Sequence, residues 1–246
     1  MKYDEIMQFM KWKGYTITEE VEVLAGQLAD CVDAGEPDIS WVLKWLEEKS
    51  KTYPAEVSEV GLNDLSKWHL DPISGNITHE SGKFFSIIGV KVNGAKGREV
   101  QSWEQPMIKQ QECGILGILC QRQNGIKKYL LYGKYEPGNN PIIQLSPTLQ
   151  ATASNLSRAH GGNKPRFSEY FENNGKGKVL VSVEGVEDGG RFYLKTNRNM
   201  IVEVEEKENI DAPEDYIWLT LPQIKRLSRE KDRVVNSLVR SILGSL

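Results

Sequence analysis

Residues 114–135, GILGILCQRQNGIKKYLLYGKY, decide the fold that we expect for this chain. Two strand-like runs, Gly114 to Gln121 and Ile126 to Tyr135, flank the dipeptide Asn124-Gly125. This pair tolerates the positive φ angles that a two-residue turn requires. The stretch therefore predicts an antiparallel β-hairpin near the middle of the chain, and the elements on either side of it show to which class of fold it belongs.

The segment before the hairpin changes from helix to strand. The first fifty residues are predicted to be helical, most clearly where apolar residues recur at i, i+3, i+4 and i+7, which are Ile39, Val42, Leu43 and Leu46. Trp41 and Trp45 widen this stripe and are interpreted as packing residues. After Pro54 the pattern becomes β, and Phe84 to Val92 is predicted to be a strand from its β-branched and aromatic residues.

After the hairpin come further strands and then helices. Val179, Val181 and Val183 alternate with other residues, and Val202 and Val204 alternate with Glu203 and Glu205, so each of these strands is expected to expose one face to solvent. Leu221–Arg229 and Val234–Leu243 are predicted to be helices, the second of which caps the sheet. Helices, many strands and then helices are typical of an α+β fold and not of a doubly wound parallel sheet.

Composition excludes several classes of protein. The chain has 246 residues, 39% of them hydrophobic and 26% charged, and a net charge of -3, so neither nucleic acid nor an anionic membrane is an expected partner. No run approaches the roughly 18 apolar residues of a membrane span, and the first residues do not resemble a signal peptide. We expect a soluble cytoplasmic protein. Its three cysteines contain no CxxC pair and predict neither a disulfide framework nor a zinc site.

Polar residues are unusually dense between Trp103 and Asn163, in short segments rich in Gly and Pro, and this density indicates a functional site. No GxSxG, Walker or GxGxxG motif occurs, which disfavours acyl-serine, P-loop and hydride chemistry. His69, His79 and His160 are too scattered to predict a zinc site. We therefore expect no metal and no cofactor.

Several uncommon clusters occur in one order over about residues 62 to 244, and together they resemble the NDP-hexose 2,3-dehydratases. They are Trp68, Asp71-Pro72, Gly75, His79-Glu80-Ser81-Gly82-Lys83-Phe84-Phe85, Gly89-Val90, Trp103-Glu104-Gln105-Pro106, Glu136-Pro137-Gly138-Asn139, Ser146-Pro147-Thr148, Gln150-Ala151-Thr152, Ser154-Asn155, Gly189-Gly190-Arg191-Phe192, Asn197-Arg198-Asn199 and Trp218-Leu219-Thr220-Leu221.

The resemblance implies an α+β fold with a Nudix-like mixed β-sheet, N-terminal helices and a C-terminal helix. We expect an N-terminal helical segment over residues 1–55 and the Nudix-like module over residues 56–246. Hydrolysis of a diphosphate is disfavoured because the Nudix box needs Arg-Glu-x-x-Glu-Glu, and here Arg98-Glu99 is followed by Val100-Gln101-Ser102-Trp103.

Two departures from the family pattern matter. Family members carry two such modules in one polypeptide, and this chain has one, which suggests that a homodimer replaces the tandem pair. The Gln-Ser-Glu that precedes the Gly-Gly-Arg-Phe-like stretch in the family is Gly185-Val186-Glu187 here, so only the glutamate remains.

The implied reaction is dehydration of an NDP-4-keto-6-deoxyhexose, expected to be dTDP-linked, across C2 and C3. A base removes the C3 proton, a donor stabilises the C4 oxyanion, and an acid protonates the departing hydroxyl. We assign the base or acid to Glu136 or Glu112 and the donor to Lys134 or His160. Lys134 and Glu136 share one face of a strand. Glu136 capping a turn and His160 bonded to loop backbone remain alternatives.

Binding residues are expected in three groups. Arg191, Lys195 and Arg198 are cations that suit the diphosphate, although each alone also fits an ordinary surface charge. Trp68 or Trp103 stacks on the nucleobase or packs in the core. The remaining predicted substrate-binding residues are polar, and a helix start at Ser146-Pro147 explains several of them equally well: His79, Gln105, Asn139, Gln150, Thr152, Ser154, Asn155 and Asn197.

Two other functions stay open. An isomerase or epimerase would form the same enolate without losing water. A catalytically silent module would bind a nucleotide sugar without turnover.

Overall fold

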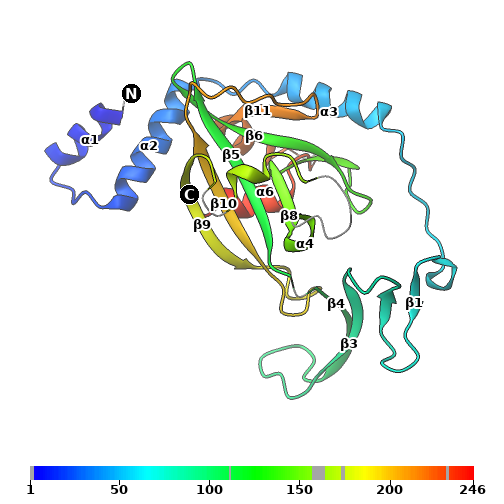
Figure 1. Cartoon of the computed structure of the whole chain (residues 1–246). Coiled ribbons are helices and arrows are strands. Elements are labelled where there is room, and N and C mark those ends of the chain that lie inside the picture. The colour runs from blue at the N-terminus through cyan, green and yellow to red at the C-terminus, as the bar shows by residue number, and fades with distance from the viewer. Residues whose placement is uncertain (1–2, 111, 157–163, 173–174, 231–232) are drawn as a thin grey trace.

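The computed structural model describes residues 3–110, 112–156, 164–172, 175–230 and 233–246, and it confirms the α+β class (Figure 1). Helices α1 (Tyr3–Trp12), α2 (Glu19–Asp33) and α3 (Ser40–Thr52) precede the strands, and α5 (Leu221–Leu227) and α6 (Ser237–Leu243) follow them. The helix predicted around Leu43 is α3. The last helix begins at Ser237, three residues after the expected Val234, because Asn236 caps it by accepting a hydrogen bond from the N–H of Leu238.

The larger sheet contains seven strands in the order β11-β6-β5-β10-β9, with β7 beside β6 and β8 beside β5. Their bounds are β5 (Gly114–Gln123), β6 (Ile126–Tyr135), β7 (Ile143–Ser146), β8 (Leu149–Thr152), β9 (Lys178–Val186), β10 (Thr196–Val204) and β11 (Tyr216–Thr220). The central hairpin is confirmed, since β5 and β6 pair antiparallel around Asn124 and Gly125, which have φ angles of 53° and 79°.

The two strands of this hairpin separate before they end. β5 and β6 pair from the turn to Leu119 and Leu130; beyond that point β5 pairs with β8, and β6 pairs with β7. Thr148 lies in the β7–β8 turn, at the place where the strands part. Its hydroxyl accepts a 2.9 Å hydrogen bond from the Leu119 N–H and donates to the Leu130 carbonyl. Strands β7 and β8 thus occupy the space between the separated parts of β5 and β6.

The alternative of a helix start at Ser146-Pro147 is wrong. Ser146 is the last residue of β7, and β8 starts at Leu149, so these residues make a strand-to-strand turn. Short polar residues and proline favour such turns as well as helix starts, and the neighbouring strands decided between the two.

Strand β10 is an inner strand, parallel to β5 and antiparallel to β9. The predicted alternation holds at the end of the strand, where Val202 and Val204 are buried and Glu203 is partly exposed, but Ile201 on the opposite face is buried as well. Hydrophobic clusters cover both faces of the strand at this point. Strand β9 is an edge strand, and Val179 and Val183 are about half exposed there, at 51% and 43%.

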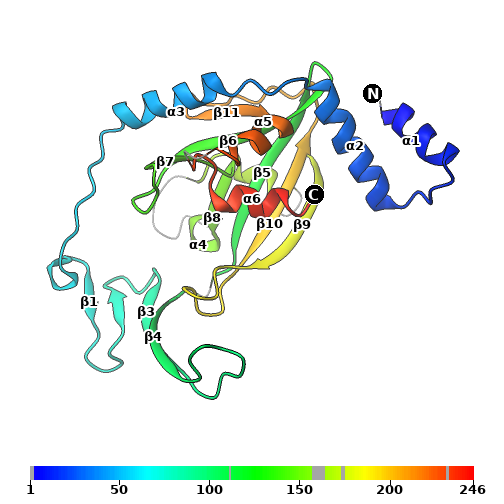
Figure 2. The ribbon, with the colours of Figure 1, turned by 180° about the vertical axis from the view of Figure 1, so that it is seen from behind.

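Helices α3, α5 and α6 cover one face of the larger sheet and form its main core with it, as the rear view shows (Figure 2). Trp45 packs as predicted, since a Cβ added to Gly133 would lie 2.6 Å from its ring. Trp41 is 44% exposed, so its interpretation as a packing residue is not supported. Val42 and Leu46 of α3 belong to the same core. The domain boundary at residue 55 stays a prediction.

A second, four-stranded sheet stands beside the main body (Figure 1). Its strands are β1 (Trp68–Leu70), β2 (Ile77–His79), β3 (Ser86–Val92) and β4 (Trp103–Lys109), and β3 is the strand that was predicted from Phe84 to Val92. The Ile108 N–H donates to the Arg191 carbonyl, and the Tyr193 N–H donates to the Ile108 carbonyl, both at 2.8 Å. These bonds hold β4 to the turn that follows β9. Within the described ranges, none of the helices is long and apolar enough to cross a membrane.

Replacing Thr148 by Val should destabilise the fold by about 2–4 kcal/mol, because it removes both hydrogen bonds at the point where β5 and β6 part and leaves buried backbone groups without a partner. Urea unfolding followed by circular dichroism measures this change. Thr16→Val, at an exposed position, is the matched control and should change stability by less than ~0.5 kcal/mol. A Thr148→Val protein as stable as the control would show that these two hydrogen bonds do not stabilise the fold.

Candidate functional site

A polar cavity of about 300 Å³ opens beside β5, β6, β8 and β10. Six residues that were predicted from the sequence line it: Lys134, Gln150, Thr152, Asn155, Lys195 and Asn197. Gln110 and Glu187 also line it, and neither was among the predicted site residues. We call this space the polar cavity.

Gly114 lines the polar cavity at the point where three strands lie side by side. In the two ladders it lies opposite Asn197 of β10 and Thr152 of β8, so strands from distant parts of the sequence meet there. A Cβ at this position would lie 2.7 Å from Asn197 Oδ1 and 3.1 Å from the Ala151 carbonyl oxygen. Only glycine therefore allows the two neighbouring strands to approach this closely.

Asn197 and Lys195 are held firmly in the cavity wall. The Gly114 N–H donates a 3.2 Å hydrogen bond to Asn197 Oδ1, and Asn197 Nδ2 donates to the Glu187 carboxylate. Lys195 Nζ donates to the Glu112 carbonyl. Lys195 is only 4% exposed, and this burial lowers its pKa, against the opposing effect of nearby Cys113, Glu187 and Glu112.

Lys134 connects two polar side chains at the opposite wall. Its Nζ lies 2.9 Å from Glu136 Oε1 and 2.7 Å from Gln150 Oε1. The sequence predicted that Lys134 and Glu136 share a face, and the ion pair confirms their proximity. Because all three groups are partly accessible, the arrangement offers an oriented ammonium group to a ligand in the polar cavity.

Some predicted residues lie outside the polar cavity. Arg191 and Arg198 are exposed, and Arg198 points away from Asn197 because side chains alternate along β10. The three predicted cations therefore do not meet: only Lys195 lines the cavity. Asn139 closes a turn, with its N–H donating to the Glu136 carbonyl at 3.0 Å. His160 and the side chain of Ser154 lie outside the described residues.

A second cavity of about 370 Å³ adjoins the first and shares Gln110 with it. Glu112 faces this second cavity, together with Lys83, Phe84 and Lys109. Neither lysine was predicted as a site residue. We call this space the lysine cavity.

An aromatic cluster borders the lysine cavity through Phe84. The Trp68 ring centroid lies 5.3 Å from that of His79 and 4.7 Å from that of Phe85, and the His79 and Phe84 rings are 4.5 Å apart. Phe84 is 52% exposed, so its ring remains accessible for stacking. Trp68 and His79 are thus brought together, as members of one aromatic cluster.

Trp103 and Gln105 have a different position. Trp103 Nε1 donates to Gln105 Oε1 at 2.8 Å, and Gln105 Nε2 donates to the Gly190 carbonyl at 2.9 Å. This chain of bonds joins the small sheet to the turn after β9. Among the residues described, these two line neither cavity, and their assignment to substrate binding stays a prediction.

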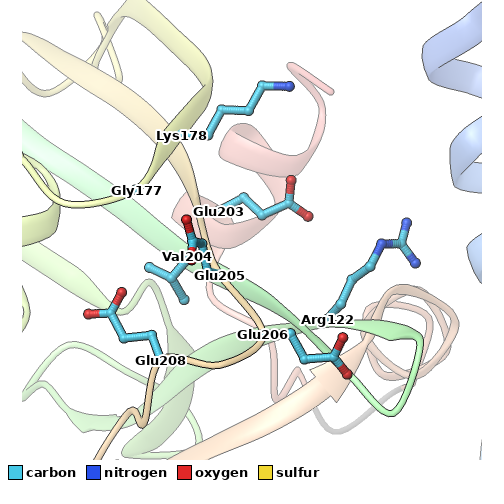
Figure 3. Close-up of a pocket in the computed structure, with 8 residues that line it drawn as sticks. All are labelled: Arg122, Gly177, Lys178, Glu203, Val204, Glu205, Glu206 and Glu208. Carbon is cyan, nitrogen blue, oxygen red and sulfur yellow. The ribbon is translucent and has the colours of Figure 1, made fainter.

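A larger cavity, of about 650 Å³, lies away from every predicted residue. In Figure 3 the carboxylates of Glu203, Glu206 and Glu208 point in different directions and do not converge. Glu203 pairs with Lys127 at 3.1 Å, and Glu208 accepts a 2.7 Å bond from the Tyr170 hydroxyl. We interpret this region as a solvated surface. No group of three or more His, Cys, Asp and Glu residues that could hold a metal ion occurs in the part of the chain that is described.

The family model of the NDP-hexose 2,3-dehydratases matches residues 40–246, which include both cavities. The chain belongs to this family. A relative from Saccharopolyspora spinosa is 42% identical over 202 residues, covering 82% of this chain and 41% of the relative. One from Amycolatopsis orientalis is 41% identical over 209 residues, covering 83% and 44%. Both are named dTDP-4-dehydro-6-deoxy-alpha-D-glucopyranose 2,3-dehydratase. This chain thus spans less than half the length of these relatives.

Two solved structures resemble the fold at a distance. The Ap4A hydrolase of C. elegans has a TM-score of 0.34 and 10% identity, covering 54% of this chain and 96% of the hydrolase. An ADP compounds hydrolase has a TM-score of 0.39 and 12% identity, covering 77% and 97%. At these TM-scores neither supports an argument about the site or its chemistry, and the Nudix-like topology continues to rest on the resemblance in sequence.

Of the two cavity residues that were not predicted, the sequence indicated Glu187 better than Gln110. Glu187 is the residue that remains of the family's Gln-Ser-Glu, and its retention beside two replaced neighbours was a usable sign. Gln110 precedes Gln111 and Glu112 in a short polar run. No local pattern distinguished Gln110 within that run.

Gly114→Ala should destabilise the protein by about 1–3 kcal/mol and weaken ligand binding, because the added Cβ displaces Asn197 from the cavity wall. Gly89→Ala is the control, since nothing lies within 4 Å of a Cβ added there. Urea unfolding of both variants measures the effect. Equal stabilities would show that Asn197 is not held as described.

Proposed function

We propose that this chain binds a nucleotide-linked 4-keto-6-deoxyhexose, dTDP-linked as in the names of its relatives, and removes water across C2 and C3. The observation that carries this proposal is the Lys134 ammonium group, held between Glu136 and Gln150 at the wall of the polar cavity. The volume of the cavity, about 300 Å³, also falls at the lower end of the range found for small-ligand sites. A cytoplasmic location is part of the same proposal.

The chemistry requires only well-placed acid and base groups. A carboxylate takes the C3 proton, and the electrons of that C–H bond form the C3–C4 enolate, whose oxyanion accepts a hydrogen bond from Lys134. The enolate then re-forms the C4 carbonyl and expels the C2 hydroxyl, which is protonated and leaves as water. The resulting enol takes up a proton at C2 and becomes the 3,4-diketone. This route requires no cofactor.

Three carboxylates compete for the role of base. Glu136 forms an ion pair with Lys134 and does not itself line the polar cavity, so it suits the task of orienting the Lys134 ammonium group. Glu187 lines the cavity and is positioned by Asn197. We therefore propose Glu187 as the base in preference to Glu136 or Glu112, since Glu112 faces the lysine cavity instead.

The lysine cavity suits the nucleoside diphosphate. Lys83 and Lys109 supply positive charge, and the half-exposed Phe84 offers a ring on which a base can stack. Because the two cavities share Gln110, one ligand can extend through both, with its hexose in the polar cavity.

We also propose that the chain forms a homodimer. In such a dimer a second copy supplies a second module of the same kind.

Incubation with dTDP-4-keto-6-deoxyglucose in deuterated buffer should give a diketone that has lost one water and carries deuterium at C2, and reduction of this diketone adds two hydrogens. A 3-ketoreductase with NADPH traps the unstable diketone for mass spectrometry. Glu187→Gln should lower kcat by at least about 100-fold, because it removes the proposed base, and Glu136→Gln should lower it less. The control is Glu56→Gln, at an exposed position.

Other outcomes of this experiment identify the alternatives. Deuterium uptake without loss of water would indicate an isomerase or epimerase. Binding without any change in the sugar would support a silent module. A Glu187→Gln enzyme as active as the control would contradict the assignment of the base but not the reaction.

Lys83→Ala and Lys109→Ala should each raise the Kd for dTDP about tenfold, which corresponds to the loss of roughly 1.4 kcal/mol in one charge-assisted contact. Titration calorimetry measures the affinity, and the control is Lys96→Ala, at an exposed position in the loop between β3 and β4. Unchanged affinity in both variants would place the diphosphate elsewhere.

A further inference from the structure

The helical hairpin formed by α1 and α2 lies before the segment that matches the family, which begins at residue 40. It projects from the side of the larger sheet (Figure 1). Its two helices pack through a small cluster of their own, made by Ile6, Met7, Ala25 and Ala29. Neither the dehydration chemistry nor the two cavities explains why this chain carries the hairpin.

The hairpin exposes a row of large apolar side chains. Leu24, Leu28 and Val32 recur at i, i+4 and i+8 on α2 and are 60%, 50% and 44% exposed. On α1, Phe9 is 53% and Trp12 is 75% exposed. Ile6 and Ala25 are buried in the cluster between the two helices. Helical geometry then places the α2 row and Phe9 on the same side of the hairpin. We call these five residues, Phe9, Trp12, Leu24, Leu28 and Val32, the hairpin face.

The extent of this face suits a partner of similar size. The five residues of the face leave roughly 600 Å² of largely apolar surface in water. A specific interface needs about 500 Å² or more from each partner, and monomers rarely expose patches above a few hundred Å². Two hairpins that cover each other therefore reach the area that a stable dimer requires.

The charges on α1 favour a second copy of the same chain. Glu5, Phe9 and Lys13 follow at i, i+4 and i+8, and the Lys13 ammonium lies 4.6 Å from the Trp12 ring centroid, over the same face. If two α1 helices pack antiparallel with Phe9 on the two-fold axis, Glu5 of each copy meets Lys13 of the other. The acidic first turn of α2, with Glu19, Glu20 and Glu22, disfavours an anionic membrane as the occupant.

We propose that the hairpin face joins two copies of this chain, the hairpins packing antiparallel about a two-fold axis as a four-helix contact. This specifies the surface of the homodimer proposed above. It does not depend on the reaction, because both the surface and its test are independent of catalysis.

Light scattering of the purified full-length chain should give twice the monomer mass of 27.8 kDa at micromolar concentration. The variants Leu24→Glu and Leu28→Glu should return the mass to that of the monomer and keep the circular dichroism spectrum unchanged. Ile73→Glu is the control, because Ile73 is 96% exposed on a different part of the chain, and this variant should remain a dimer. A monomeric wild-type chain, or a dimer that both hairpin variants retain, would overturn the proposal.

A charge exchange tests the antiparallel geometry directly. Glu5→Lys and Lys13→Glu each place like charges together in a homodimer, so each alone should weaken dimerisation several-fold. Mixed together, the two variants form a heterodimer with opposite charges at both contacts, and native mass spectrometry should find it in excess over either homodimer. A statistical mixture would contradict the antiparallel packing.

Discussion

The hydroxyl of Thr148 lies where the two strands of the central hairpin part, and the candidate site exists because they part there. It bonds the backbone of Leu119 on one strand and of Leu130 on the other, and so it replaces the ladder that would otherwise continue. Beyond this point β7 and β8 line the opening. Lys134 on β6 and Gln150 on β8 face each other across it, which is the contact that the proposed chemistry uses.

The other wall of the polar cavity depends on the parallel pairing of β10 with β5. This pairing places Asn197 beside Gly114, although they are far apart in the sequence. Lys195 becomes buried by the same pairing, and Glu187 comes within reach of Asn197. Because the strands on both sides leave little space, glycine at position 114 is a requirement of the geometry.

The two cavities differ in character in a way that suits the two ends of a nucleotide sugar. The polar cavity contains hydrogen-bonding groups and one oriented ammonium group, which are the groups that an enolate needs. The lysine cavity has cations and an accessible aromatic ring. The N-terminal hairpin lies outside both of them, and its exposed apolar residues are explained by association.

The sequence alone determined the features whose cause is local. The turn at Asn124-Gly125 requires residues that accept positive φ, and helix α3 follows from an apolar spacing that fits a helix. The family likewise followed from short clusters in a fixed order. About the site, the sequence identified six residues of the polar cavity. Only the tertiary structure decided that Arg198 points away from it, that Glu187 belongs to it and that hydrophobic clusters cover both faces of β10 at Ile201 and Val202. These facts depend on which strands lie next to one another, and strand pairing over long separations is set by the packing of the whole chain, because no local pattern of residues encodes it.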